Sequence, residues 1–262
     1  MLSTAGIYYS IGKKLILNGI TAEFQPGEFN MILGPNGSGK STFLKIFSGE
    51  ISGYAGDILY AQKKINQFKK EELAKCRAVM SQQPELNFPL TVDEVVMMGR
   101  YPHFSFNPNK KDEVICDEVM KKMNLLDFRE RNYLTLSGGE KQRVQFARVL
   151  AQIWETPGEN GARYLFLDEP LTSLDINYQQ EFLQLATEFC KAGTVLVAVM
   201  HDINLATLYG DKLFFLKEGE LVKHGKPSDI LSTELLYKVF GVNTTLINDP
   251  VSNTPVVLYN KH

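Results

Sequence analysis

One short stretch of this 262-residue chain combines glycines, a lysine and hydroxyl side chains in a spacing that suits phosphate chemistry. The stretch is Gly34-Pro35-Asn36-Gly37-Ser38-Gly39-Lys40-Ser41-Thr42. Glycines let a backbone curl so that successive N–H groups point inward and surround phosphate oxygens. Lys40 can then reach the β- and γ-phosphates of a nucleotide, and the Ser41 hydroxyl can hold Mg²⁺. We therefore expect a nucleotide site here.

The residues on either side predict the elements that hold this stretch. Residues 29–33 form a mainly apolar run of strand length, and residues 42–47 show the spacing of a helix. A strand, a glycine-rich turn and a helix N-terminus match G-x-x-x-x-G-K-[ST], the P-loop pattern. The helix adds the positive end of its dipole to the phosphate site. A glycine-rich turn with a chance lysine is the alternative, and it leaves both flanking elements unexplained.

A second group of candidates follows the apolar run Tyr164–Leu167, which is typical of a buried parallel strand. Asp168 and Glu169 stand at the carboxyl end of this strand, the edge that faces a ligand crevice. Asp168 is placed to bind Mg²⁺ through water, as the partner carboxylate of a P-loop. Glu169 can polarise an attacking water as a general base. An acidic strand-to-loop transition without a catalytic role is the competing interpretation.

A helix predicted at about residues 140–154 begins after Leu136-Ser137-Gly138-Gly139-Glu140. Ser137 and Glu140 fit a capping box, with the two glycines in its first turn. Glycines are poor helix formers, so capping alone does not explain them. A serine and two glycines at a helix N-terminus make an open, positively polarised surface that suits a phosphate. Because Lys40 already serves one side of a nucleotide, this surface can serve a nucleotide on another copy of the chain.

Two further polar residues end predicted strands. Gln82 ends the run 78–82, and His201 follows the run 195–200. Each alone is more often structural than catalytic. In a parallel sheet, however, strand ends gather around one crevice, so both are candidate site residues.

Composition excludes several classes of protein. Hydrophobic residues make up 44% and charged residues 22%, which is ordinary for a soluble globular protein. The formal net charge of −2 gives no basic field for nucleic acid. The longest apolar run, Val195–Met200, is too short to span a bilayer, and the N-terminus lacks a signal-peptide pattern. We expect Cys76, Cys116 and Cys190 to be free thiols in a reducing cytoplasm.

Weaker patterns suggest the remaining elements. A capping box at Thr91 predicts a helix that stops near Gly99, and the whole stretch from about residue 84 looks helical and inserted. Strands, hairpins and helices are expected elsewhere: a hairpin around residues 12–14, a strand at 58–60, a helix at about 179–190, a hairpin around 217–219, a helix at 232–240 and a strand at 255–258.

Together these motifs resemble the ATP-binding-cassette (ABC) ATPases over essentially the whole chain and in the order of that family. The matching segments are Gly34–Thr42 (Walker A), Gln82 (Q-loop), Leu136–Glu140 (the signature LSGGQ, with Glu140 for glutamine), Tyr164–Glu169 (Walker B), Ser173-Leu174-Asp175 (D-loop) and His201 (switch histidine). The resemblance implies an α/β fold, a P-loop NTPase with a RecA-like core, an antiparallel β subdomain and an inserted all-α subdomain. The expected single domain, 1–262, divides into a core with the β subdomain (about 1–83 and 141–225), a helical subdomain (about 84–140) and a C-terminal extension (about 226–262).

The resemblance also implies an ATPase that works as a head-to-tail homodimer. Each ATP, with Mg²⁺, would lie between Walker A of one chain and Ser137-Gly138-Gly139 of the other. Thr42 would contact the α-phosphate, Gln82 would sense Mg²⁺ and the attacking water, and His201 would contact the γ-phosphate. The aromatic residue that stacks on adenine is expected at Tyr9 or Tyr8, although the spacing from the P-loop can place Ile11 there instead.

A closer resemblance is to the ATPases of importers for iron chelates, haem and cobalamin. The segment Pro84–Phe104 is similar to the region with which those ATPases grip their permease. Residues 148–154 and the tail segments 239–242 and 255–258 are similar to haem-importer ATPases in particular. The resemblance thus implies a subunit of a bacterial haem importer, peripheral on the cytoplasmic face of the inner membrane. It also implies a periplasmic binding protein as indirect partner and no nucleic acid.

Two alternatives stay open at this point. The cargo of the importer can be a ferric siderophore or cobalamin, because selectivity lies in the permease and the binding protein. A soluble ABC ATPase of DNA repair or translation is the alternative of a different class. The chain has one cassette, no heptad run and no basic patch, which disfavours that second alternative.

Overall fold

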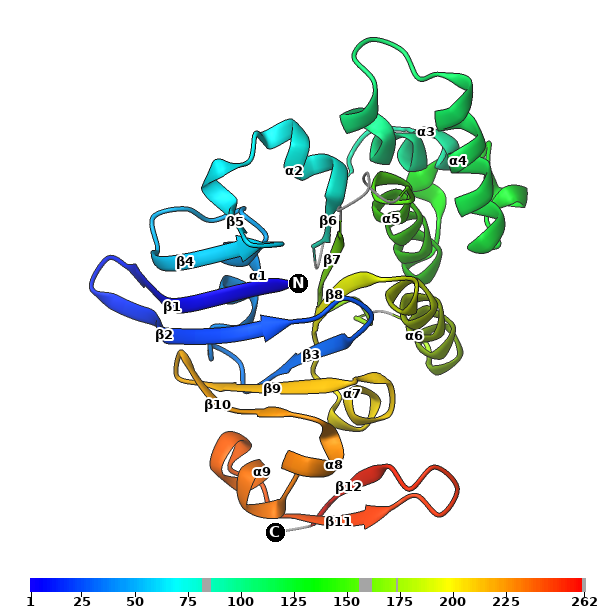
Figure 1. Ribbon diagram of the computed structural model, residues 1–262. Coiled ribbons are helices and arrows are strands. Elements are labelled where there is room, and N and C mark those ends of the chain that lie inside the picture. Colours follow the sequence, from blue (N-terminus) through cyan, green and yellow to red (C-terminus); the bar gives the residue numbers. More distant parts are fainter. Residues whose placement is uncertain (82–85, 156–161, 173, 261–262) are drawn as a thin grey trace. The chain divides into compact units, whose positions relative to one another are not determined.

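The computed structural model describes residues 1–81, 86–155, 162–172 and 174–260. The chain forms two compact units, the first built from residues 1–67 and 187–262 and the second from residues 68–186. The chain contains both strands and helices, and they alternate from α5 to β9 (Figure 1), which confirms the predicted α/β class. The predicted subdomain boundaries near residues 83, 140 and 225 stay a prediction. Among the described residues, no helix is both long and apolar enough to cross a membrane.

An antiparallel sheet in the first unit contains the N-terminal strands. Its order is β2-β1-β4-β5. The elements are β1 (Leu2–Ile11), β2 (Lys14–Phe24), β4 (Ala55–Tyr60), β5 (Lys63–Lys64) and the short 3-10 helix η1 (Ile65–Gln67). Ile11 lies opposite Lys14, so the hairpin predicted around residues 12–14 is confirmed. Buried and exposed side chains alternate toward the end of β2, the pattern of a sheet with one covered face.

A second sheet of the first unit carries the glycine-rich stretch. Its strands lie in the order β10 (Glu220–Gly225), β9 (Lys212–Lys217), β3 (Phe29–Leu33) and β8 (Thr194–Val199). β3 is parallel to β8 and β9, whereas β10 is antiparallel to β9. Every residue of β3 and β8 is buried, as expected for strands covered on both faces. Helix α1 (Lys40–Phe47) follows the glycine-rich stretch and buries Phe43, Leu44 and Phe47.

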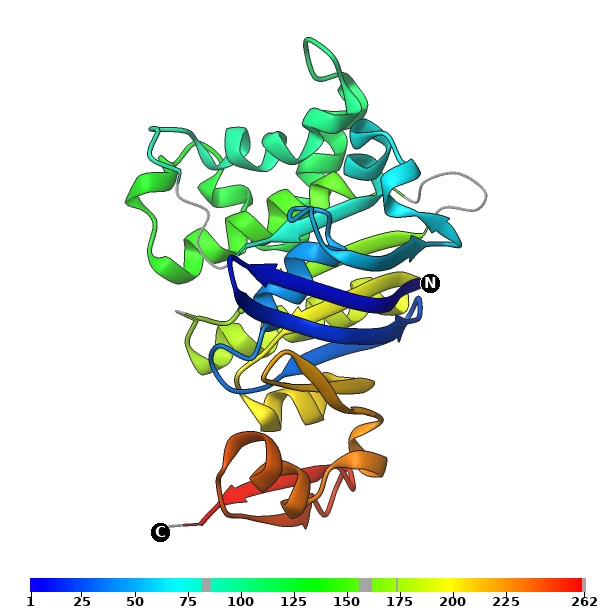
Figure 2. The same ribbon diagram turned by 90° about the vertical axis from the view of Figure 1, so that its left-hand side faces the viewer.

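The C-terminal residues of the first unit form small elements that lie together (Figures 1 and 2, orange to red). These elements are α8 (Pro227–Ile230), α9 (Thr233–Phe240), β11 (Thr244–Asn248) and β12 (Pro255–Tyr259). Helix α7 (Ile203–Tyr209) comes earlier in the sequence, before β9 and β10. Ser232 caps the N-terminus of α9, and Gly241, with φ of 71°, ends it. The predicted tail helix and the predicted strand at 255–258 are therefore confirmed, whereas β11 was not predicted.

The second unit combines two parallel strands with helices. β6 (Arg77–Met80) pairs with β7 (Arg163–Asp168). The α-helices are α2 (Lys70–Cys76), α3 (Val92–Met97), α4 (Lys110–Lys122), α5 (Gly138–Gln152) and α6 (Ile176–Lys191). Helix α6 begins in the second unit and ends in the first. The 3-10 helices are η2 (Met98–His103), η3 (Leu126–Phe128) and η4 (Tyr133–Thr135). Helices α3, α4 and α5 pack against one another (Figure 1, green). The stretch predicted to be helical is confirmed in its described residues.

The helix predicted to begin at Thr91 and to stop near Gly99 is confirmed. Thr91 is the N-cap of α3, which ends at Met97, and η2 continues through Gly99 to His103. A Cβ atom on Gly99 would lie 2.1 Å from the backbone oxygen of Arg148 in α5. The close approach of η2 to α5 is therefore the reason for a glycine at this position, and the sequence did not reveal it.

Arg100 holds the helices of the second unit together through a buried charge network. Its side chain is 1% exposed. It donates to Oδ1 of Asp112 at 2.9 Å, to the backbone oxygen of Ala151 at 2.8 Å and to Oε2 of Glu155 at 2.7 Å. Arg100 belongs to the segment expected to contact a permease, but its burial assigns it to the interior. This corrects the expectation for that one residue.

Replacement of Arg100 by Met should destabilise the protein strongly. Asp112, whose side chain is 2% exposed, would keep a buried carboxylate without its cation, at a cost of about 3–5 kcal/mol. The matched control is Arg129→Met, because Arg129 also has two carboxylate partners, Asp93 and Asp117, but is 35% exposed. Its loss should cost about 1 kcal/mol or less. Urea unfolding followed by the fluorescence of Trp154, the single tryptophan, measures both. Equal costs for the two variants would contradict the structural role of Arg100.

Candidate functional site

Close packing within the first unit explains Gly34 and Gly39, two of the three glycines of the P-loop stretch, whereas Gly37 has φ of 77° and, among the described residues, open space beside it. The loop connects the end of β3 to the start of α1. A Cβ atom on Gly34 would lie 2.1 Å from the backbone oxygen of Leu216 in β9. Gly39, the N-cap of α1, has φ of 99°, and a Cβ there would lie 2.7 Å from Cδ2 of Leu17 in β2. The predicted strand, turn and helix N-terminus are confirmed. The turn packs against β9 of one sheet and β2 of the other.

Lys40 and Ser38 have the properties expected of phosphate ligands. Lys40 is 5% exposed, and its ammonium donates to the backbone oxygens of Gly34 at 2.8 Å and Pro35 at 3.1 Å. The ammonium is therefore held against the backbone of the same loop that would bind a phosphate. The Oγ atom of Ser38 is buried and has no hydrogen-bond partner among the described residues. A buried hydroxyl without a partner in a loop of backbone N–H groups fits a phosphate ligand.

His201 follows a strand next to the one that leads into the P-loop. β3 and β8 are parallel, with Ile32 opposite Val199, and the N–H of Met200 donates to the oxygen of Ile32 at 3.0 Å. The P-loop and His201 therefore leave the sheet at the same edge, as the sequence predicted. His201 is exposed there.

Asp168 and Glu169 stand at the end of β7 in the second unit. Asp168 is the last strand residue and is 3% exposed. Glu169 is half-buried and has φ of 51°, a left-handed conformation that costs a non-glycine residue about 1–2 kcal/mol. The hydroxyl of Thr172 donates to the backbone oxygen of Glu169 at 3.1 Å and supports this turn. Strained backbone of this kind is found at functional positions, which favours a role for Glu169.

Gln82 lies outside the described residues, and so does Ser173 of the predicted D-loop. Strand β6 ends at Met80, two residues before the predicted end. Because Met80 lies opposite Leu167 in a parallel pair, the chain leaves β6 at the edge where Asp168 ends β7.

The signature residues begin α5 with the predicted capping box. The Oγ of Ser137 accepts from the N–H of Glu140 at 3.3 Å, and Oε2 of Glu140 accepts from the N–H of Ser137 at 2.7 Å. The hydrogen bond from the N–H of Ser137 to the carboxylate is the largest cause that lowers the pKa of Glu140, followed by the side chain of Ser137. Gly138 and Gly139 are the first two helical residues, and Ser137 and Gly138 are exposed. A Cβ on Gly139 would meet Leu174 only at 3.6 Å, so packing among the described residues does not require a glycine there.

Two residues that the sequence analysis missed connect α5 to the segment after Glu169. The side-chain amide of Gln142 donates to the backbone oxygen of Pro170. The guanidinium of Arg143 lies 4.7 Å from the ring centre of Tyr178 in α6. Both follow Gly139 at helical spacings of three and four residues, which is the signal that could have indicated a shared face.

The adenine contact stays a prediction. Tyr8, Tyr9 and Ile11 all lie on β1. Tyr8 is 48% and Ile11 60% exposed, and Tyr9 is partly exposed opposite Leu17. All three side chains are thus accessible to a base.

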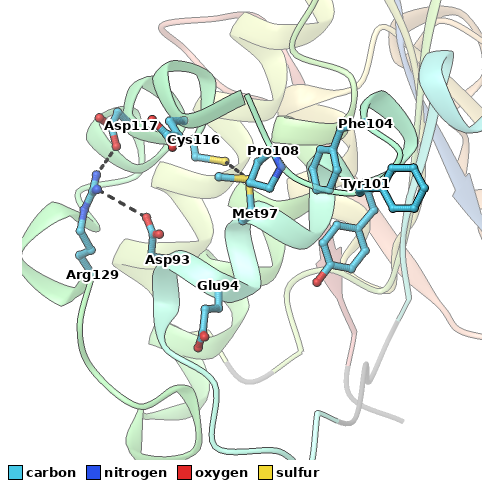
Figure 3. A pocket seen from close by; sticks show the side chains of 11 residues that line it. Asp93, Glu94, Met97, Tyr101, Phe104, Pro108, Cys116, Asp117 and Arg129 are labelled. Atoms are coloured by element: carbon cyan, nitrogen blue, oxygen red, sulfur yellow. Dashed lines mark hydrogen bonds and ion pairs between the residues drawn. The ribbon is translucent and has the colours of Figure 1, made fainter. Parts of the chain in front are cut away.

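A groove of about 560 Å³ lies among α3, η2 and α4 of the second unit. Figure 3 shows Tyr101 and Phe104 at one end and Arg129 reaching Asp93 and Asp117 at the other. We name it the acidic groove, because its described lining residues include four carboxylates and one guanidinium. They are Asp93, Glu94, Met97, Tyr101, Phe104, Phe106, Pro108, Glu113, Cys116, Asp117 and Arg129.

The cysteines are free thiols, as predicted, and they are buried. Burial raises the pKa of Cys76 to about 11 and that of Cys116 and Cys190 to about 12. They therefore stay protonated at neutral pH and do not supply a nucleophile.

Comparison with known proteins agrees with this set of motifs. The family model described as ABC transporter matches residues 17–172. The hemin import ATP-binding protein HmuV of Gloeobacter violaceus is 43% identical over 98% of this chain and 94% of its own length. The protein of the same name from Mesorhizobium japonicum is 40% identical over 98% of both chains.

A solved structure shows the same fold. The dimeric structure of MJ0796, a bacterial ABC transporter cassette, matches with a TM-score of 0.72 and 28% identity over 86% of this chain and 98% of its own. The predicted P-loop NTPase fold of ABC ATPases is therefore confirmed. The matched family model, the two relatives and this structure agree with the P-loop, signature and strand-end carboxylates, so the chain belongs to the ABC transporter family and is one of its ATP-hydrolysing subunits.

Proposed function

We propose that this chain drives a bacterial importer for haem, as a head-to-tail homodimer on the cytoplasmic face of the inner membrane. The observation that carries the proposal is the similarity along nearly the whole chain to relatives named for hemin import. The similarity includes the tail, which lies beyond the 17–172 match of the general family model.

ATP binding would use the P-loop of each chain. The backbone N–H groups of residues 36–42 and the buried Ser38 hydroxyl would surround the phosphates, with Thr42 at the α-phosphate. Lys40 would exchange its two backbone acceptors for β- and γ-phosphate oxygens. Ser41, Gln82 and, through water, Asp168 would hold Mg²⁺. Bound Mg²⁺ would neutralise negative charge on the β- and γ-phosphates.

Hydrolysis would use residues that follow the strands. Glu169 would accept a proton from a water whose oxygen attacks the γ-phosphorus, while the bond to the β,γ-bridging oxygen breaks and ADP leaves with the electron pair. Gln82 would orient this water, and His201 would donate a hydrogen bond to the γ-phosphate. Neither role requires a covalent intermediate on the protein.

The second face of each nucleotide would come from the partner chain. The exposure of Ser137 and Gly138 at the N-terminus of α5 supports this assignment, since N–H groups of a first helical turn have no acceptor within the helix. Gly139 also supports the assignment to the partner's nucleotide. Its neighbours leave room for a Cβ, so the close approach of a ligand would explain why a glycine stands there.

Glu169→Gln should lower ATP turnover by about 10²-fold or more, the usual scale for loss of a general base. Glutamine keeps the size of the side chain but cannot accept the proton, so ATP should stay bound and the dimer should accumulate. Phosphate release and size-exclusion chromatography with ATP and Mg²⁺ measure the two effects. Normal turnover in this variant would remove Glu169 from its role. Slow turnover without a dimer would instead argue against the head-to-tail arrangement.

The acidic groove is the surface that we propose for the permease. It contains the exposed end of the expected contact segment, where Tyr101 is 58% exposed, and continues to Phe106, which is 95% exposed. Aromatic side chains exposed to this degree are typical of interaction sites. The lining of the groove has four carboxylates and one guanidinium, so its charge favours a permease segment with basic residues. Its exposed aromatic side chains favour an apolar side chain in the same segment.

Phe106→Ser should weaken permease binding by about tenfold, the equivalent of about 1.4 kcal/mol. The fold should not change, because the side chain is almost fully exposed. Val251→Ser is the matched control, since Val251 is 92% exposed but lies in the first unit. Titration of the purified chain onto its permease in detergent measures the affinity. Unchanged affinity for Phe106→Ser, with equal ATP turnover of the free chains, would exclude this end of the groove from the interface.

The cargo is tested by reconstitution of the chain in proteoliposomes with its co-expressed permease and binding protein. Haem, a ferric siderophore and cobalamin are supplied in turn, and both ATP hydrolysis and uptake are measured. We expect stimulation and uptake with haem alone. Stimulation by a siderophore or cobalamin would overturn the cargo but keep the importer. Failure to associate with any permease would favour the soluble alternative.

A further inference from the structure

The side-chain amide of Asn204 makes the two hydrogen bonds with β12 that the backbone of a neighbouring strand would otherwise make. Its Nδ2 donates to the backbone oxygen of Val257 at 3.1 Å, and its Oδ1 accepts from the N–H of Val257 at 2.8 Å. Val257 lies opposite Leu246 of β11, and because both of its backbone groups bond to Asn204, the two residues form a non-hydrogen-bonded pair of the ladder. One side chain thus satisfies both backbone groups at a residue that is 1% exposed.

Asn204 stands three residues after His201, at the start of α7. The carboxylate of Asp202 caps this helix by accepting from the N–H of Leu205 at 2.9 Å. On the other side of His201, the N–H of Met200 is held by β3. His201 therefore lies between Met200, which is hydrogen-bonded to β3, and Asn204, which is hydrogen-bonded to β12.

The hairpin of β11 and β12, which we name the tail hairpin, has a second contact with this region. Strand β12 packs against α7, and the pKa of Tyr259, the last residue of β12, is raised by burial and then by the negative charge of Asp202. The helix before the hairpin is itself anchored. Lys217 in β9 donates to the backbone oxygen of Lys238 in α9 at 2.7 Å, and Leu236 and Val239 are buried.

Helix α7 needs such support. It has seven residues, of which Ile203, Ala206 and Thr207 are buried, and Leu208 is 54% exposed. Helices this short are marginal in isolation, so tertiary contacts decide where they begin. The two hydrogen bonds of Asn204 come from its first turn, closest to His201.

We propose that the tail hairpin positions the switch histidine, with Asn204 as the positioning residue. The amide fixes the first turn of α7, and this turn fixes the backbone from which His201 reaches the γ-phosphate. The proposal rests on the function proposed above for His201. It also gives the tail hairpin a regulatory role, because any partner that displaces the hairpin would displace the histidine without touching the nucleotide.

The test compares Asn204→Ala and Asn204→Asp with Thr245→Val. Alanine removes both hydrogen bonds. Aspartate has nearly the same shape and keeps the acceptor, but it replaces the donor with an oxygen that faces the oxygen of Val257. Thr245→Val is the matched control, since it removes a hydrogen bond to Asn260 within the hairpin, at 3.1 Å, and leaves the contact with α7 intact.

Both Asn204 variants should lower kcat at least fivefold and change the affinity for a fluorescent ATP analogue less than twofold. The control should change neither. Carbon-13 labelling of the four histidine rings gives a readout apart from activity. The His201 signal, assigned by its loss in His201→Gln, should shift in the Asn204 variants, whereas His103 and His224 should keep their positions.

An unmoved His201 signal in folded Asn204→Asp would overturn the proposal, and so would an equal loss of kcat in Thr245→Val. These outcomes are separate from a failure of the proposed function. If His201→Gln retains full turnover, the role of the histidine itself is wrong. If that variant is inactive while the Asn204 variants are normal, only the positioning role of the tail hairpin is lost.

Discussion

The backbone of the P-loop is held so closely by its neighbours that side chains are excluded at its two ends. At Gly34 the neighbour is the carbonyl of Leu216, and at Gly39 it is Leu17. The turn between β9 and β10 closes the arrangement, because the N–H of Gly219 donates to the backbone oxygen of Ser38 at 3.1 Å. A loop confined in this way keeps its N–H groups in place without a ligand, which is the preorganisation that phosphate binding needs.

The second unit fixes its candidate residues by different means. Glu169 is held in a strained turn, and the signature serine is held by its capping box. The contacts of Gln142 and Arg143 join the signature helix to the segment that follows Glu169. A residue proposed to serve the chain's own nucleotide and a residue proposed to serve the partner's nucleotide therefore belong to one packed structure.

Local signals explain what the sequence could predict. The P-loop strand, the capping box at Ser137 and the Gly241 helix stop all depend on neighbours within a few residues. Gly99 and Arg100 could not be understood in this way, because Gly99 packs against Arg148 and Arg100 donates to Ala151, and both partners lie about fifty residues away in α5. The amide of Asn204 depends on Val257, and no periodicity connects two such distant residues.

The ammonium of Lys40 donates to two backbone oxygens of its own loop. Phosphate binding at this lysine is therefore an exchange of acceptors, and the gain is the difference between the two sets. A carbonyl dipole is replaced with net gain only by an oxygen of greater negative charge. The contribution of Lys40 to nucleotide affinity is therefore smaller than the strength of its contacts with the phosphates alone.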